Sequence, residues 1–221
     1  MSTRPGVDWF RQKAVPTMTP KLPLPTEELA IGFVNTVAWR LRSPTEERLD
    51  SPETLLVWLE QNDLLSGGER RRMARGWTTR PRDATAVYET ALRLREAIYE
   101  LLLSLTKRKR PAAAALKYFG DFVSHPPSTS RLQWQHGRLT WCGKTAPRNA
   151  HDLLQPIAWS AAELLTGSRA VRIKQCQDDR GCGWLFIDES RLQNRRWCSM
   201  GDCGNVAKAR RHRHRTRPRG A

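Results

Sequence analysis

The chain has 221 residues and a mass of 25.4 kDa, the size of one large domain or two small ones. Hydrophobic residues make up 39 % of it and recur with helical spacing, which excludes a collagen-like or wholly disordered chain. Its 38 Lys and Arg against 22 Asp and Glu give a formal charge of +16. This excess of positive charge favours an acidic partner, most often nucleic acid.

No stretch of the sequence approaches the roughly 18–20 consecutive apolar residues of a membrane span. Residues 1–20 also lack the apolar stretch of a signal peptide, so we expect a cytoplasmic protein with no membrane partner. In that reducing compartment, its five cysteines are not expected to form a disulfide framework.

Charge and cysteine are concentrated at the C-terminal end of the chain. Residues 191–221 hold ten Lys or Arg against one acidic residue, Asp202, and four of the five cysteines lie in the last 46 residues. This change in composition predicts two modules that meet near residues 168–172. The expected parts are a lead over 1–25, a helical domain over 26–168, a metal-binding module over 170–215 and a basic tail over 216–221.

The first module is predicted to be mostly helical, because its apolar residues recur at spacings of three and four. Around His136-Gly137 the apolar residues alternate instead, which predicts a short hairpin over 132–141. The expected helices begin at Thr26, Ser51, Asp83, Ala112 and either Asn149 or His151. The first is expected to carry its apolar stripe from Leu29 to Val37, and Asp83 is the expected N-cap of the longest one. The fold class is therefore mainly α, a helical bundle with one small β-hairpin.

The clustered cysteines form two close pairs with 15 residues between them: Cys176 and Cys182, then Cys198 and Cys203. This arrangement is typical of a tetrahedral Zn²⁺ site, and four thiolates leave no open position for catalysis. A module of about 40 residues is too small to fold on its own core, so we expect one structural zinc ion. The alternatives are four independent cysteines, or ligation by His212 or His214. Cys142 is expected to be a packed thiol.

From Asn205 onward the sequence lacks Gly and Pro until Pro218, so we expect a basic helix over 205–215. Trp184 and Trp197 are expected to pack beside the metal, with base stacking as the alternative. The alternatives for the whole basic run are a solvated tail, or a nonspecific anchor to RNA or to a membrane. The residues expected to contact nucleic acid are Arg191, Arg195, Arg196, Lys208, Arg210, Arg211, Arg213 and Arg215.

Two sets of motifs resemble a known bacterial family. The run Arg195–Met200 followed by Cys203-Gly204-Asn205 resembles the CGNR zinc finger, and Gly32–Val37 with Trp39-Arg40 resembles the "FVNT" signature of the ABATE domain that precedes it. Residues 92–97 and 152–156 also fit that domain, so the resemblance covers about residues 26–215. It implies a zinc-ribbon or treble-clef-like module that ends in a basic helix, and a stress-linked transcriptional regulator that binds nucleic acid.

The resemblance carries the family's cysteines onto the same four positions. It also shows one departure, because Val206 stands where the motif has Arg. If that Arg braces a thiolate or contacts phosphate, one such interaction is absent from this chain.

The helical domain is expected to sense a ligand, to form a homodimer, or both. Asn35 lies in an apolar segment, and a buried amide needs a hydrogen-bond partner. Asn35, Trp39, Arg40 and Arg95 therefore form either a small-molecule pocket or an internal bracket of the bundle. The sequence shows no phosphate-binding loop and no hydrolase or metalloprotease motif, so we expect no enzyme. The leading hypothesis is a nucleoid-associated DNA-binding regulator; the alternatives are an RNA- or ribosome-associated protein and a small-molecule enzyme.

Overall fold

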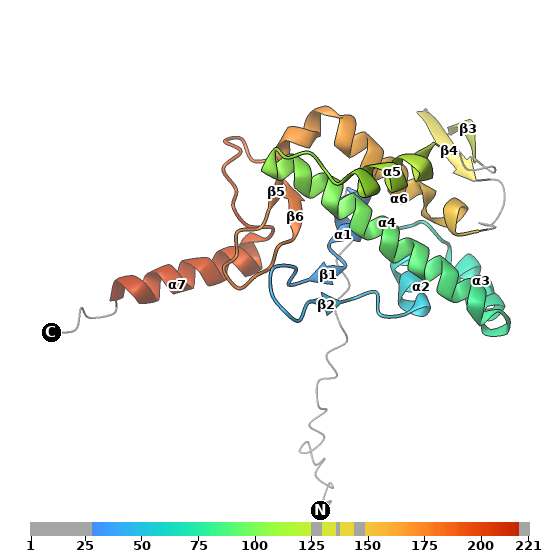
Figure 1. Cartoon of the computed structure of the whole chain (residues 1–221), viewed down its shortest axis with the longest axis horizontal. Helices are drawn as coiled ribbons and strands as arrows, with labels where there is room; N and C mark the ends of the chain where they lie inside the picture. The colour runs from blue at the N-terminus through green and yellow to red at the C-terminus, as the bar shows by residue number, and fades with distance from the viewer. Residues whose placement is uncertain (1–27, 125–129, 136–137, 144–148, 217–221) are drawn as a thin grey trace, which may run out of the picture.

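The computed structural model describes residues 28–124, 130–135, 138–143 and 149–216 (Figure 1). The α-helices are α1 (Leu29–Val34), α2 (Pro52–Gln61), α3 (Gly67–Thr79), α4 (Pro81–Lys107), α5 (Ala113–Val123), α6 (Ala150–Thr166) and α7 (Asn205–Thr216). The strands are β1 (Val37–Ala38), β2 (Glu46–Glu47), β3 (Ser130–Gln135), β4 (Arg138–Gly143), β5 (Ile173–Gln175) and β6 (Leu185–Ile187). Two short helical turns, η1 (Ser168–Arg172) and η2 (Met200–Gly204), complete the described elements. No described helix is long and apolar enough to cross a membrane.

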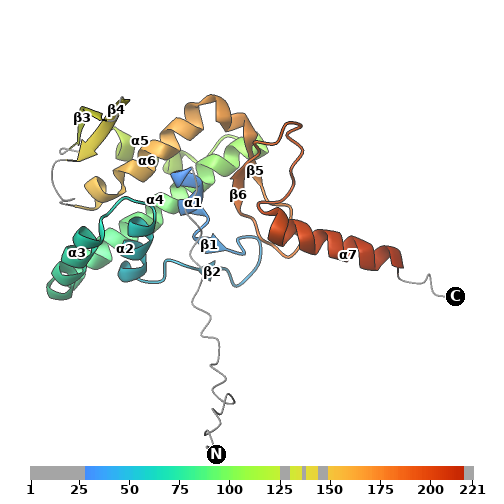
Figure 2. The ribbon, with the colours of Figure 1, turned by 180° about the vertical axis from the view of Figure 1, so that it is seen from behind.

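The 27-residue helix α4 is the centre of the helical domain (Figures 1 and 2). Helices α1, α2, α3, α5 and α6 all pack against it. Its buried residues Leu94, Ile98 and Leu102 recur every four positions, so they form one stripe that faces a core containing Phe33 and Trp58. The mainly α fold predicted from this periodicity is confirmed, and the short β1–β2 pair is an element that the sequence did not predict.

Two predicted helix boundaries are wrong. The first helix ends at Val34 and does not reach Val37, which pairs with Glu47 in the β1–β2 sheet. The longest helix begins at Pro81, and its N-cap is Arg80 rather than Asp83. Proline suits the first helical position because it has no backbone N–H to leave unsatisfied and its φ is already helical. Asp83 lies in the first turn, where its charge is favourable to the helix dipole.

Helix α3 forms where the sequence predicted no element. Ser66 is its N-cap: the Ser66 hydroxyl accepts from the Glu69 N–H (3.3 Å), and the Ser66 N–H donates to the Glu69 carboxylate (2.8 Å). This reciprocal pair is a capping box, which satisfies two backbone donors at once. The Ser-x-x-Glu spacing was the available signal, but Gly67-Gly68 and the following arginines leave only Trp77 buried.

The predicted starts of α2, α5 and α6 and the predicted hairpin agree with the structure, and the predicted start at Thr26 lies outside the described residues. Ser51 caps α2, and Asn149 rather than His151 caps α6, where its side chain accepts from the Asp152 N–H (2.8 Å). Strands β3 and β4 pair antiparallel over the predicted hairpin, with its turn at 136–137 outside the described residues. The side chain of Cys142 lies outside them too, so its packing stays a prediction.

The C-terminal module is built on the antiparallel pair β5–β6, which packs directly on the helical domain. Ile173 of β5 and Leu185 of β6 belong to the same buried core as α4 and α1. The predicted basic helix is α7, and it extends away from the rest of the molecule (Figures 1 and 2). The module is therefore anchored at its strands, and its basic helix projects outward.

Candidate metal centre

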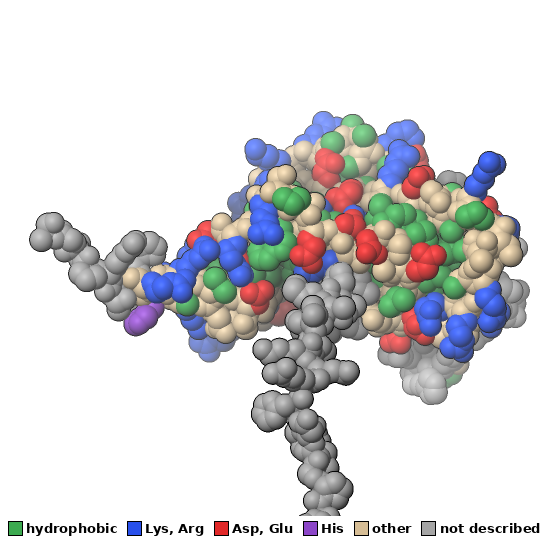
Figure 3. Space-filling view, turned by 90° about the horizontal axis from the view of Figure 1, so that it is seen from below, with side chains coloured by type: hydrophobic (Ala, Val, Ile, Leu, Met, Phe, Trp, Pro, Cys, Tyr) green, Lys and Arg blue, Asp and Glu red, His purple; other side chains and the backbone are tan. Residues whose placement is uncertain are grey.

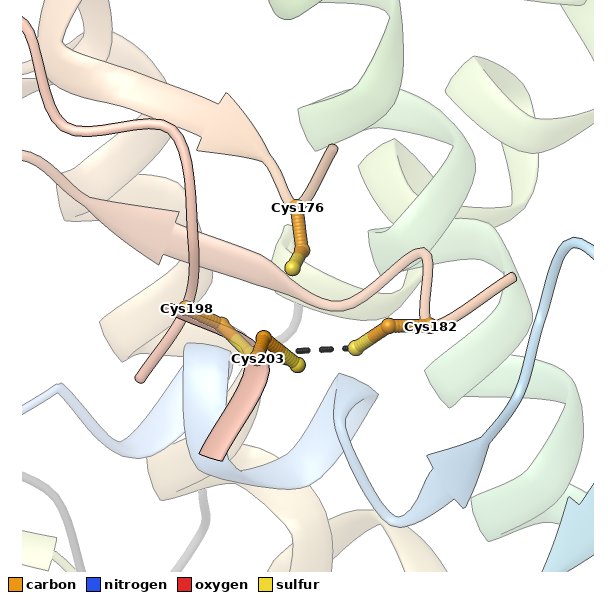
Figure 4. Close-up of side chains that lie close together, drawn as sticks. All are labelled: Cys176, Cys182, Cys198 and Cys203. Atoms are coloured by element: carbon orange, nitrogen blue, oxygen red, sulfur yellow. Dashed lines mark hydrogen bonds between the residues drawn. The ribbon is translucent and has the colours of Figure 1, made fainter. Parts of the chain in front are cut away.

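Four cysteine side chains converge in the C-terminal module (Figure 4). Cys176 follows β5, Cys182 precedes β6, Cys198 lies in the loop after β6, and Cys203 lies in η2. The four sulfurs lie within 4.8 Å of one another, and Cys198 Sγ is 3.7 Å from both Cys182 Sγ and Cys203 Sγ.

These separations fit a tetrahedral metal centre. A Zn–S bond of about 2.3 Å places two sulfurs of a tetrahedron about 3.8 Å apart, and a disulfide would bring them to about 2.05 Å. All four cysteines are free thiols, and Cys176, Cys182 and Cys203 are buried. The cluster can therefore hold one metal ion, and the four-sulfur donor set is that of structural zinc.

The backbone around Cys182 requires glycine on both sides. Gly181 and Gly183 have φ values of +90° and +68°, a region that other residues rarely adopt. A Cβ on Gly183 would also lie 2.8 Å from the Leu41 side chain. The tight turn thus carries the Cys182 sulfur toward the cluster while its backbone contacts the helical domain.

Without a cation, the cluster does not favour four thiolates. Hydrogen bonds with Cys176 and Cys182 raise the pKa of Cys198, and burial raises the pKa of Cys203. Only at Cys176 is the pKa lowered, mainly by the hydrogen bond from Cys182. A divalent cation would compensate the charge of the additional thiolates, so the chemistry of the donor set fits a bound metal.

One arginine contacts the cluster directly. Arg180 lies 3.7 Å from Cys203 Sγ through an N–H donor, and it also donates to the buried carboxylate of Asp178 (2.6 Å) and to Asp202 (3.1 Å). Burial raises the pKa of Asp178, but these hydrogen bonds outweigh that effect and lower it to about 2. Arg180 therefore braces the sulfur of Cys203. Cys203 lies three residues before Val206, the position at which the family motif has an arginine.

Asn35 fixes β6 to the helical domain. Its amide nitrogen donates to the Leu185 carbonyl (2.8 Å), and its carbonyl oxygen accepts from the Leu185 N–H (3.0 Å). Asn35 is 7 % exposed and Leu185 is fully buried. Trp184 and Trp197 both pack against the cysteine cluster, as predicted, and the Trp184 indole N–H donates to the Val37 carbonyl (2.7 Å).

The turn around Cys182 is held by a second set of contacts. The backbone N–H of Arg40 donates to the Cys182 carbonyl (3.0 Å), and the N–H of Leu41 donates to the Gly181 carbonyl (3.1 Å). The Tyr99 hydroxyl of α4 donates to the Gly183 carbonyl (3.0 Å). Sequence reasoning missed this docking; the buried amide of Asn35 was its one visible signal.

The other residues of the predicted ligand pocket have protein partners. Trp39 donates to Glu46 (3.2 Å), Arg40 donates to Glu96 (2.8 Å) and the Val34 carbonyl (2.8 Å), and Arg95 donates to Glu47 (2.6 and 2.7 Å) and Glu96 (2.9 Å). Arg95 is 3 % exposed, and its hydrogen bonds to Glu47 raise its pKa against the opposing effect of burial. These contacts match the internal bracket, and a small-molecule pocket at these positions stays a prediction.

Arg195 has a structural role in the finger. Its guanidinium donates to the carbonyls of Trp197 (2.7 Å) and Cys198 and lies 4.7 Å above the Phe186 ring. These contacts orient the loop that carries Cys198, so this predicted nucleic-acid contact is engaged inside the module. The described metal cluster is formed by cysteines, and the exposed His212 is not part of it. The His214 side chain lies outside the described residues.

Several of the other predicted contacts are exposed on or beside α7, where Lys and Arg side chains gather (Figure 3). Arg191 and Lys208 are exposed and make no ion pair among the described residues. Trp197 lies near two cations, because the guanidinium carbons of Arg196 and Arg211 are each 5.6 Å from its ring centroid. The remaining predicted contacts are Arg210, which pairs with Asp179, the exposed Arg213, and Arg215, whose side chain lies outside the described residues.

Comparison with known families agrees with this geometry and with the resemblance in the motifs. A family model described as "Putative stress-induced transcription regulator" (ABATE) matches residues 27–168, and the model of the CGNR zinc finger matches residues 172–216. No curated protein matches the chain. The order of the two matches is that predicted from the sequence, and the first alone spans well over half of the chain. This chain belongs to the ABATE family and carries a CGNR zinc finger after its ABATE domain.

Proposed function

We propose that this protein is a transcription regulator that binds duplex DNA through its CGNR finger and α7. The observation that carries the proposal is the placement of α7: a 12-residue basic helix that begins two residues after a metal-ligating cysteine and projects from the body (Figure 1). The family description of the ABATE domain supports a regulatory role.

The length and the exposed cations of α7 suit a polyanion with a groove wide enough for an α-helix. The major groove of B-DNA accepts an α-helix, and α7 is about 18 Å long at 1.5 Å per residue. Lys208 and Arg211 are exposed on it, and Arg196 and Arg211 both lie near the Trp197 ring. The metal and the docking contacts fix the start of α7. The helix therefore loses less conformational entropy when it binds DNA.

The helical domain serves as the base on which the finger is mounted. Its contacts through Asn35 and Tyr99 hold the finger at one angle, so a change in the ABATE domain would alter the placement of α7. The same proposal includes three further points. The helical domain senses a ligand, forms a homodimer, or does both; the protein is located at the nucleoid; and it has no catalytic role.

Binding of a fluorescent duplex, followed by anisotropy between 50 and 300 mM salt, tests the proposal. Neutralising about six phosphates gives a slope of log K against log salt near −5. The variant Cys198→Ser/Cys203→Ser should lose this binding, and Cys142→Ser, which changes the one cysteine outside the cluster, should keep it. Unchanged binding by the double variant, or a preference for competing RNA over duplex, would contradict the proposal.

A further inference from the structure

A second basic cluster lies at the C-terminal end of α4. Lys107 is the last residue of the helix, and Arg108, Lys109 and Arg110 follow it, all four exposed. In the part of the chain that the structure describes, none of these four side chains makes a hydrogen bond or an ion pair. The cluster therefore presents four positive charges to solvent with no carboxylate partner.

Stabilisation of α4 does not account for this cluster. A cation interacts with the helix dipole within the last turn, and of the four only Lys107 belongs to the helix. The backbone already closes the helix, because the N–H groups of Arg108 and Lys109 donate to the carbonyls of Leu105 (3.1 Å) and Ser104 (3.0 Å). The three charges after Lys107 thus have no hydrogen-bond or ion-pair partner in the described part of the fold.

The segment that carries the cluster is held in place at both ends. Arg108 adopts the left-handed conformation at φ +49°, which turns the chain away from the helix axis. At the far end, the N–H of Ala112 donates to the Glu100 carboxylate of α4 (3.0 Å). Cations on such a fixed turn lose less conformational freedom on binding than cations on a free tail.

One residue of the cluster, Lys107, lines a cavity that α4 shares with the finger. Thr106 and Lys107 of α4 line a cavity of about 490 Å³ together with Gln177, Asn194 and Arg196 of the finger. Figure 1 shows this end of α4 beside β5. Lys107 and Arg196 line this cavity without a carboxylate partner among the described residues, whereas Lys174 is paired with Asp188 (2.6 Å), so the two unpaired cations give it a potential that favours anions.

We propose that the turn at Lys107–Arg110 is a second phosphate-contacting surface, so that one DNA duplex lies across the finger and the end of α4 together. The inference rests on the proposed function and deepens it, because it makes the ABATE domain a direct part of the DNA interface. Duplex DNA fits this surface because its phosphates form a continuous array that reaches cations in separate elements.

The test compares two variants that remove the same charge. Lys107→Ala/Lys109→Ala/Arg110→Ala removes three cations from the cluster and leaves Arg108 on its left-handed backbone. The control, Arg71→Ala/Arg72→Ala/Arg75→Ala, removes three exposed cations from α3. Arg72 lines a cavity with Val87 of α4, and Val87 precedes Lys107 by 20 residues, about 30 Å along the helix. Both variants are measured as zinc-loaded full-length chains in the duplex anisotropy assay.

If at least two phosphates are contacted, the cluster variant should flatten the salt slope by about 2 and weaken binding roughly 10- to 100-fold at 0.1 M salt. The α3 control should bind within about twofold of the parent, since its cations lie far from the proposed path of the duplex. Equal affinities and slopes for both variants would overturn the inference while leaving DNA binding by the finger intact. No binding by the unaltered chain would overturn the proposed function, and this inference with it.

Discussion

Replacing Asn35 with alanine tests how the finger is attached to the helical domain. The Asn35 amide makes two hydrogen bonds to the backbone of Leu185, at 2.8 and 3.0 Å, and both residues are buried. Alanine offers neither a donor nor an acceptor, so both backbone groups of Leu185 lose their partner on that side. The change leaves the four cysteines and α7 untouched.

The expected loss of stability follows from those two groups. A buried backbone donor or acceptor left without a partner costs about 1–3 kcal/mol, so two such groups give about 2–6 kcal/mol. Water can reach part of the space that the amide vacates, which places our expectation near 3 kcal/mol. This is a large share of the roughly 5–15 kcal/mol by which a domain is stable.

Urea unfolding of the zinc-loaded chain, followed by tryptophan fluorescence, measures this loss, and hydrogen exchange locates it. The Leu185 amide should exchange faster in Asn35→Ala. Asn194→Ala serves as the matched control, because Asn194 is exposed and makes no hydrogen bond among the described residues. A stability change below about 0.5 kcal/mol, the usual range of surface substitutions, together with unchanged protection of Leu185, would refute the docking argument.

Three further substitutions test other contacts. Arg180→Ala should weaken zinc affinity about 10- to 100-fold in a chelator competition, since it removes the N–H donor to Cys203; unchanged affinity would exclude that role. Arg95→Met should cost about 2–4 kcal/mol in urea unfolding, because Glu47 loses its buried partner; a neutral result would mean that water replaces the ion pair. Trp184→Phe should cost about 1 kcal/mol in the same assay through loss of the bond to the Val37 carbonyl, and an equal stability would count against that bond.

The metal cluster and the helices were predictable because their signals are local. Two close cysteine pairs separated by 15 residues suffice to indicate a tetrahedral site, and the stripe through Leu94 and Ile98 suffices to place α4. Helix α3 was not predicted, because its apolar stripe is weak although a Ser66–Glu69 capping box is present. Capping chemistry there carries information that hydrophobic periodicity does not.

The docking of the finger was not predictable, because its partners are far apart in the chain. Asn35 and Leu185 are separated by 150 positions, and no spacing rule connects them. The sequence showed a buried amide in need of a partner, without showing whether that partner was a ligand or the backbone of the finger. The same holds for Arg180, whose contact with Cys203 depends on the turn between two cysteines.

The central claim is that a metal ion bound by Cys176, Cys182, Cys198 and Cys203 holds the finger in the structure described. The most direct measurement is the metal content of the purified full-length chain by mass spectrometry, combined with hydrogen exchange across residues 173–205. We expect one zinc ion per chain, lost from Cys198→Ser/Cys203→Ser together with the protection of these amides. A metal-free chain whose finger amides remain fully protected would contradict the claim.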